Sequence, residues 1–586
     1  MSSNIIPSID ILPVEILHRI FDNLDAQTIL FSIRPVCRLF RAVVNTYDRY
    51  VFDFKFISKS NFHLLCRLIN PQNIISLTLR DNEYTLDQIA LFISLVRLRQ
   101  LTRLHSITFF DIEEFQLNMI LKRINLNLLT SFSLNIRKHD DRRKKTTLSF
   151  LSSIMAQSSL RKVELNMKSD RISNISWPLN CRITCLTINE HIPFDDLCRI
   201  LSCSPQLHTL ILRQNLSIMI NKMILPSSFP QLTSLTIEQL NITIDKLESF
   251  LSLTPSLVYL KFIGEGSVFD GKRWEQFIQI NLSHLDTFEF FINIEMLTGQ
   301  TREDLELLIE PFRSPFWIEY KKWFIACEFS MDPPYRIQIY SIPICKSVLH
   351  YKLDSEKIFI STSSMSLYHD PSILNNIKEI NLSLKMPISD AIIQEALKRT
   401  SPLFPKVTKL HIDVSMDYRR KNPLASIKFL TSIIDVSQLV EVKLESYCFG
   451  KDRKMILFDM MTIIEQSYNL SSLIIHSRLS KYELYPFLDN LCSVIPRRIK
   501  HLQIPINRLD QIKIILERCQ DLSVVQFAIT RSKFSEEVIQ WFTQNTIDST
   551  FRRRDECNII WIGKKTNEIS INHKRMKLTD DNQFNS

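Results

Sequence analysis

The feature that most constrains the fold of this chain is a short apolar pattern that recurs at nearly even spacing. The pattern has apolar residues at the first, fourth and sixth of six positions, as at Leu207, Leu210 and Leu212. Its middle position, 210, returns at 235 and 260, which is about 25 residues each time. A phased series indicates a structural repeat whose units cannot bury their own apolar faces, so neighbouring units must stack.

The pattern continues in both directions and gives about fifteen copies. Neighbouring copies lie roughly 23 to 32 residues apart, close to the period of roughly 20 to 29 residues that is typical of leucine-rich repeats. The middle positions of the further copies are Leu77, Ile107, Phe132, Val163, Leu186, Phe288, Ile380, Leu410, Val442, Leu473, Leu502 and Val525.

Between the copies the apolar spacing becomes helical, for example over residues 195–201, 246–251 and 511–516. Each unit therefore reads as helix, turn and strand. This predicts an α/β repeat solenoid, a leucine-rich-repeat horseshoe with strands on the concave side and helices outside.

The repeat divides the chain into segments. We expect a first block over 53–290 and a second over 377–530, separated by an aromatic-rich insertion at 291–376. Within the insertion, Asp332, Pro333 and Pro334 form a turn signal between two strand-like runs, which predicts a hairpin. Its aromatic residues form either a private core or a recognition surface. A basic, partly disordered tail is expected over 531–586.

Residues 1–52 do not follow the repeat and predict three short helices. Pro13 suits the first turn of the first helix, and Asp25 can cap the second. Pro35 would break a continuous helix, so the second helix should end near Ile33 and the third should start at Pro35.

This segment resembles an F-box through Leu12-Pro13-x-Glu15-Ile16-Leu17-x-x-Ile20-Phe21-x-x-Leu24, followed by Val36-Cys37-Arg38-x-Phe40. Tyr50 stands where the motif often closes with Trp. The resemblance implies a non-catalytic substrate-recognition subunit of an SCF-type (cullin-RING) E3 ubiquitin ligase. Such a subunit docks on an SKP-type adaptor and captures a protein substrate with its repeats. The residues that the resemblance assigns to adaptor binding are Leu12, Pro13, Ile16, Leu17, Ile20, Phe21, Leu24, Ile29, Val36, Cys37 and Phe40.

An alternative is an interaction scaffold without a ligase link, in which these helices only cap the first repeat. A cap needs one apolar face, toward the repeats, whereas an adaptor-binding domain needs a second. The apolar residues extend around the first helix, which favours burial on two sides.

Candidate substrate contacts follow from the alternation of side chains along a strand. Residues between the apolar anchors should project from the concave face. The candidates are Thr209, Ile211, Arg213, Lys409, His411, Asp413, Glu441, Lys443 and Glu445.

Composition argues against catalysis and cofactors. The chain has only 6 Gly, and the cluster Gly264, Gly266 and Gly271 fits no nucleotide-binding pattern. Neither a Gly-x-Ser-x-Gly elbow nor a His-Glu-x-x-His motif occurs. The closest cysteine pairs, Cys181 with Cys185 and Cys198 with Cys203, lack a second pair at zinc-site spacing, so we predict buried thiols and no metal.

The net charge of +10 is mild for 586 residues. The basic runs 142–145 and 552–554 have acidic neighbours and predict solvated loops, with an RNA-binding solenoid as the alternative. No secretory signal and no apolar run of roughly 18 residues is present, so we expect no membrane association and a cytoplasmic or nuclear location.

Overall fold

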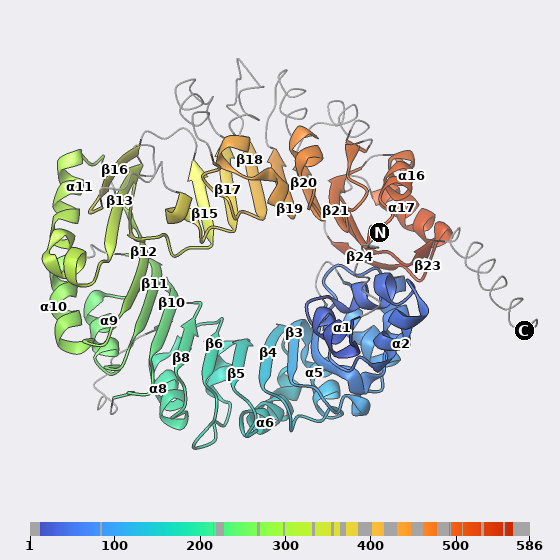
Figure 1. The fold of residues 1–586 in the computed structure, drawn as a ribbon, viewed down its shortest axis with the longest axis horizontal. Coiled ribbons are helices and arrows are strands. Elements are labelled where there is room, and N and C mark those ends of the chain that lie inside the picture. Colours follow the sequence, from blue (N-terminus) through green and yellow to red (C-terminus); the bar gives the residue numbers. More distant parts are fainter. Residues whose placement is uncertain are drawn as a thin grey trace, which may run out of the picture. The chain divides into compact units, whose positions relative to one another are not determined.

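The computed structural model describes most of the chain: residues 12–81, 85–214, 216–217, 228–266, 270–296, 299–330, 335–352, 357–363, 371–384, 401–414, 430–446, 461–477, 491–492, 494–506, 508–528, 532–554 and 557–565. The chain forms two compact units, Met1–Leu207 and His208–Ser586, which are described separately. In both units helices lie along one side of the strands (Figure 1).

The first unit begins with three helical segments, α1 (Val14–Phe21), the π-helical η2 (Thr28–Ile33) and α2 (Arg38–Thr46). The Asp25 carboxylate caps the second segment, since its Oδ1 accepts from the Thr28 amide at 2.8 Å. This segment ends at Ile33, as expected. The third starts at Arg38 rather than Pro35, because the extended residue Cys37 is its N-cap and accepts from the Phe40 amide at 3.4 Å.

Parallel strands follow these helices. The strands are β1 (Tyr50–Asp53), β2 (Ile74–Arg80), β3 (Ser106–Glu113), β4 (Ser131–Lys138), β5 (Lys162–Asn166) and β6 (Cys185–Ile188). They alternate with α3 (Lys59–Leu68), α4 (Gln88–Leu95), α5 (Glu114–Leu121), α6 (Lys144–Met155) and α7 (Ser169–Ser173), and α8 (Phe194–Cys203) comes after them. The expected anchors pair directly in register and are buried: Leu77, Ile107, Phe132, Val163 and Leu186.

The first sheet of the second unit combines parallel and antiparallel strands. β8 (Thr209–Leu212), β10 (Ser234–Leu240), β11 (Tyr259–Glu265) and β12 (Thr287–Glu295) are parallel. β14 (Arg336–Ile342), β13 (Phe324–Ser330) and β16 (Lys357–Ser361) then continue the sheet antiparallel. Its helices are α9 (Ile244–Leu251), α10 (Gly271–Asn281), α11 (Arg302–Ile309), η6 (Glu310–Arg313) and η7 (Phe316–Tyr320).

The strands β13 and β14 flank the turn signal at 332–334, which itself lies outside the described residues. Phe312 and Trp317 are buried, with ring centroids 5.0 Å apart. These aromatic side chains are therefore part of the core, whereas Tyr320 is exposed.

The second sheet of this unit is again mainly parallel. Its strands are β15 (Val348–Lys352), β17 (Glu379–Leu384), β18 (Lys409–Val414), β19 (Glu441–Ser446), β20 (Ser472–Ser477), β21 (His501–Pro505) and β22 (Val524–Ala528). β25 (Cys557–Trp561) and β24 (Thr550–Arg554) complete it antiparallel, and α16 (Leu509–Arg518) and α17 (Ser532–Asn545) pack along this part.

Two features of this sheet lie at the edges of the expected segments. β15, within 291–376, pairs with β17 through Leu349 and Ile380 and so already belongs to the repeat. The pattern misses it because Lys346 stands at its first apolar position. Within 531–586, β25 pairs with β22, and Trp561 is buried.

The chain is thus an α/β repeat architecture of alternating strands and helices with parallel sheets. Among the described residues, the structure contains no helix with the length and hydropathy needed to span a bilayer.

Candidate binding surfaces

The N-terminal helices divide the predicted adaptor-binding residues into an inner and an outer set. Leu17, Phe21, Ile29 and Phe40 are at most 8% exposed. Leu12, Ile16, Ile20 and Val36 are between 37% and 65% exposed, and we call these four the outer apolar face. Pro13 is exposed as well, whereas Leu24 and Cys37 are half-buried.

The helical period explains this division. Leu17 and Phe21 are four residues apart and share the inward face of α1, where both are buried. Ile16 and Ile20 have the same spacing one position earlier, so they form the neighbouring stripe. Val14 and Leu39, which the motif treats as variable positions, are also exposed and add apolar surface. The apolar side chains of Val14 and Leu39 were the sequence signal that could have identified these two residues.

The inner side of these helices is held by two tyrosines. The buried Tyr47 hydroxyl donates to Asp22 Oδ1 at 2.9 Å, which connects the end of α1 with the end of α2. Burial, and then the nearby Asp22 carboxylate, raises the pKa of Tyr47. Tyr50, the aromatic residue that closes the motif, donates to the Val44 carbonyl at 3.0 Å, and burial raises its pKa to about 12. These contacts fix α1, α2 and β1 as one piece beneath the outer apolar face.

Three of the predicted substrate contacts lie on β8 or directly after it. Thr209 and Ile211 are half-buried between the buried anchors Leu210 and Leu212, as strand alternation requires. Arg213 is exposed, and its Nε lies 3.6 Å from Glu238 Oε2 on β10.

The other six lie on β18 and β19 and are in direct register. Lys409 pairs with Glu441, His411 with Lys443, and Asp413 with Glu445. Because β8 and β18 belong to different sheets, the structure forms one group of three and another of six.

Within this group, His411 and Lys443 both contact Glu445, whereas Lys409 Nζ lies 3.9 Å from Glu379 Oε2 on β17. Lys443 Nζ lies 2.6 Å from Glu445 Oε1, and His411 Nε2 lies 3.5 Å from Glu445 Oε2. Burial alone would raise the pKa of Glu445, but the hydrogen bond and charge of Lys443 outweigh burial and lower it. His411 Nδ1 also lies 3.2 Å from Asn381 Oδ1 on β17, so the polar face continues onto a strand that the candidate residues omitted. The side-chain alternation used for β18 would have identified Asn381. This surface supplies charges of both signs for recognition.

Of the four cysteines predicted to be buried thiols, Cys181 and Cys198 are buried, whereas Cys185 and Cys203 are half-buried. Burial raises the pKa of Cys198, Cys327 and Cys345 to about 12, so these groups stay protonated at neutral pH. Burial also raises the pKa of Cys181 and Cys185. Within the described residues, no cluster of three or more His, Cys, Asp or Glu side chains has an arrangement suited to a metal ion.

The basic run at 142–145 is partly neutralised by its surroundings. Arg143 Nε lies 3.1 Å from Asp140 Oδ2, and Lys144 Nζ lies 2.7 Å from Asp170 Oδ2. Arg142 and Lys145 are exposed.

Comparison with known proteins gives a family match for the N-terminal segment. A family model described as F-box-like matches residues 9–50. No curated protein matches the sequence. Among solved structures, the chain is similar to the leucine-rich repeat-containing protein LegL7 from Legionella pneumophila, with 13% identity over 65% of this chain and 96% of that protein and a TM-score of 0.25. It is also similar to the structure of a TLR13–ssRNA13 complex, with 14% identity over 78% of this chain and 54% of that chain and a TM-score of 0.24. An F-box-like domain thus occupies residues 9–50 of a chain that continues as alternating strands and helices.

Proposed function

We propose that this chain is the substrate-recognition subunit of an SCF-type (cullin-RING) E3 ubiquitin ligase. The observation that carries the proposal is the outer apolar face, Leu12, Ile16, Ile20 and Val36, within the F-box-like match at 9–50. These side chains are exposed although the same helices bury a separate inner set. Ile16 and Ile20 share one stripe of α1, and exposed apolar patches mark protein interaction sites. F-box domains bind SKP-type adaptors.

In this proposal the repeats bind a protein substrate on their strand side. Residues 1–52 bind the adaptor, and the blocks 53–290 and 377–530, with the insertion 291–376, recognise the substrate. The contribution to catalysis is proximity, because two binding surfaces on one chain hold substrate lysines near a conjugating enzyme that other subunits supply. Such a receptor works inside the cell and needs no cofactor.

Co-purification of the full chain with an SKP-type adaptor tests the proposal. We expect a stable complex with the wild-type chain and at least a tenfold loss of affinity in Ile16→Ala/Ile20→Ala, because exposed anchors at an interface contribute about 2 kcal/mol or more. The matched control is Ile280→Ala on α10, which removes an exposed isoleucine outside the F-box-like match and should leave binding unchanged.

Unfolding by urea distinguishes the two hypotheses for the N-terminal helices, which are an adaptor-binding domain and a cap for the repeats. If they only cap the repeats, Ile16→Ala/Ile20→Ala lowers the urea midpoint and no adaptor complex forms with either chain. That result would contradict the receptor function and leave an interaction scaffold.

A further inference from the structure

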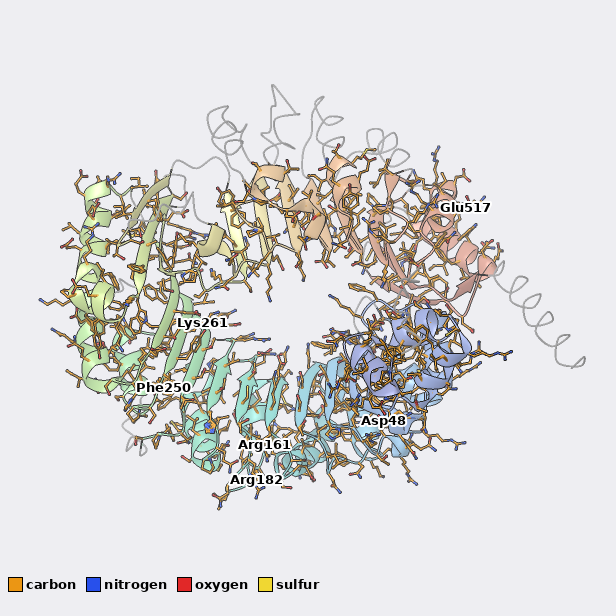
Figure 2. All side chains as sticks on the ribbon, in the orientation of Figure 1. Asp48, Arg161, Arg182, Phe250, Lys261 and Glu517 are labelled. Atoms are coloured by element: carbon orange, nitrogen blue, oxygen red, sulfur yellow. The ribbon has the colours of Figure 1, made fainter. Side chains whose placement is uncertain are left out.

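A cavity of about 730 Å³ lies at the carboxyl ends of β10, β11 and β12 in the second unit. This volume falls within the range of roughly 300 to 1,000 Å³ that is usual for ligand pockets. Lys346, from the segment between β14 and β15, completes its lining. This segment is fixed over the strands, because Lys261 Nζ on β11 donates to the Cys345 carbonyl at 2.6 Å. Figure 2 labels Lys261, whose side chain leaves β11 on the side away from α9.

A β-bulge shapes the floor of the cavity. Ile237 pairs with Phe262, but the next pair is Leu240 with Gly264, so β10 contains one extra residue. The strands approach so closely there that a Cβ on Gly264 would lie 2.4 Å from the Leu240 carbonyl oxygen. Bulges redirect side chains and are frequent beside functional sites. Here Glu238 and Gln239, at the bulge, both line the cavity.

Gly266 is a second glycine in the lining, and a Cβ there would meet no atom within 4 Å. Two of the chain's 6 glycines therefore lie at this cavity. Two members of the glycine cluster that fits no nucleotide pattern thus have structural roles: Gly264 permits the close approach of the strands, and Gly266 leaves one end of the cavity without a side chain.

The lining has a distinct chemistry. It contains a carboxylate from each strand, Glu238, Glu265 and Glu295, and one cation, Lys346. The lining residues themselves thus carry three carboxylates and one ammonium, and Arg213 and Arg336 beside the cavity pair with two of the carboxylates. Amide side chains that can bond a peptide backbone accompany the charges: Gln239, Asn241 and Asn293.

The carboxylates are accessible to a new partner. Glu238 lies 3.6 Å from Arg213, and Glu295 lies 3.0 Å from Arg336, in pairs whose side chains are 38% to 66% exposed. Exposed pairs of this kind contribute little, so exchanging one cation for another is inexpensive. The Lys346 ammonium lies 3.9 Å from the centroid of the Phe291 ring, a contact that holds it on the wall of the cavity.

The geometry points to a peptide-binding cavity that takes an arginine or lysine side chain of a bound protein segment. The cationic group lies among Glu238, Glu265 and Glu295, and the amide side chains bond the peptide backbone. Binding itself is independent of the adaptor, but the assignment of this segment to a ligase substrate rests on the proposed function.

Fluorescence anisotropy with the full chain tests the cavity. The probe is a fluorescein-labelled nonapeptide with arginine at alternate positions among glycine and serine. The matched probe replaces each arginine with citrulline, which keeps the shape and removes the charge. We expect the citrulline peptide to bind at least about tenfold more weakly, since hydrogen bonds between charged groups are worth that factor. Equal binding of the two probes overturns the proposal.

Variants locate the binding. Glu265→Gln/Glu295→Gln should weaken the arginine probe about tenfold, whereas Glu303→Gln, which removes an exposed carboxylate on α11, should not. Lys346→Met should keep or strengthen binding, because it removes a like charge. Loss of binding in Lys346→Met with full binding in the glutamate variant would identify an anion site and overturn the proposal. All three variants should still co-purify with the adaptor, so a failed cavity and a failed receptor function give different results.

Discussion

At the scale of single residues, Arg171 of the first unit occupies the most unusual position. Its side chain and that of Glu114 are each only 1% exposed, and Nη1 donates to Glu114 Oε1 at 3.2 Å. Nη2 donates to the exposed Asp141 at 2.9 Å, and the Asp140 amide donates to the other Glu114 oxygen at 2.6 Å. These bonds tie α5 and α7 to the start of the basic run, which is therefore anchored to the repeat at that end.

Arg171→Met should lower the free energy of unfolding by about 3–5 kcal/mol, because it leaves the Glu114 carboxylate buried without its charge partner. Urea denaturation followed by circular dichroism measures the loss. Arg171→Met/Glu114→Met should recover most of it, because replacing a buried ion pair with apolar side chains is often close to neutral. A double variant as unstable as the single one would contradict this account. Arg313→Met, which removes exposed pairs with Glu306 and Glu310, should cost less than about 1 kcal/mol.

At the scale of secondary structure elements, local sequence sets most ends of helices. α11 begins with a capping box in which Thr301 and Asp304 bond each other's backbone amides, at 2.8 and 3.3 Å. α10 begins at Gly271 and is capped by Asp270, whose Oδ1 accepts from the Lys272 amide at 2.9 Å. The β10–β11 bulge differs from these caps, because the need for Gly264 comes from Leu240, which lies on the neighbouring strand.

Gly264→Ala should lower the free energy of unfolding by about 1–3 kcal/mol, because the new methyl group overlaps the Leu240 backbone and forces the strands apart. Chemical denaturation gives the size of the effect, and amide hydrogen exchange should show faster exchange in β10 and β11. Gly299→Ala is the matched control, since a Cβ there meets nothing within 4 Å, and it should stay within about 0.5 kcal/mol of wild type. Equal effects of the two substitutions would show that the close approach at 264 does not constrain the sheet.

At the scale of the whole molecule, the net charge and its pairing indicate whether the chain can bind nucleic acid tightly. The net charge is +10 over 586 residues, and Arg143 and Lys144 of one basic run already have carboxylate partners. Tight binding to nucleic acid requires many phosphates to be neutralised at once.

We expect a fluorescein-labelled 20-nucleotide single-stranded RNA to bind only at the nonspecific level, with a Kd above about 1 µM at 150 mM salt. The logarithm of the binding constant should fall with the logarithm of salt with a slope of about 2 or less, because a net charge of +10 spread over 586 residues neutralises few phosphates at once. Anisotropy titrations at salt concentrations from about 50 to about 200 mM measure both the Kd and the salt slope. Submicromolar binding with a steep slope would favour the RNA-binding alternative.

The sequence by itself determined the repeat and its register. Leu77, Ile107 and Phe132 pair directly because each unit places the same anchor at the same distance from its turn. Both ends of the second N-terminal helix were also readable, since Asp25 and the break before Pro35 act on neighbouring residues. The start of the third helix was not, because it lies at Arg38 and not at Pro35. These features depend on contacts within one unit of about 25 residues, and such contacts are visible as a period.

Only the tertiary structure decided which apolar residues face outward and where a cavity forms. Leu17 and Ile16 are adjacent and both apolar, yet Leu17 is 1% exposed and Ile16 is 38% exposed. Glu238, Glu265 and Lys346 are far apart in the sequence and meet because a bulge and a crossing segment place them at one edge of a sheet. A periodic pattern specifies which residues are anchors. It does not specify the partner that each remaining face meets, because that partner comes from elements distant in the chain.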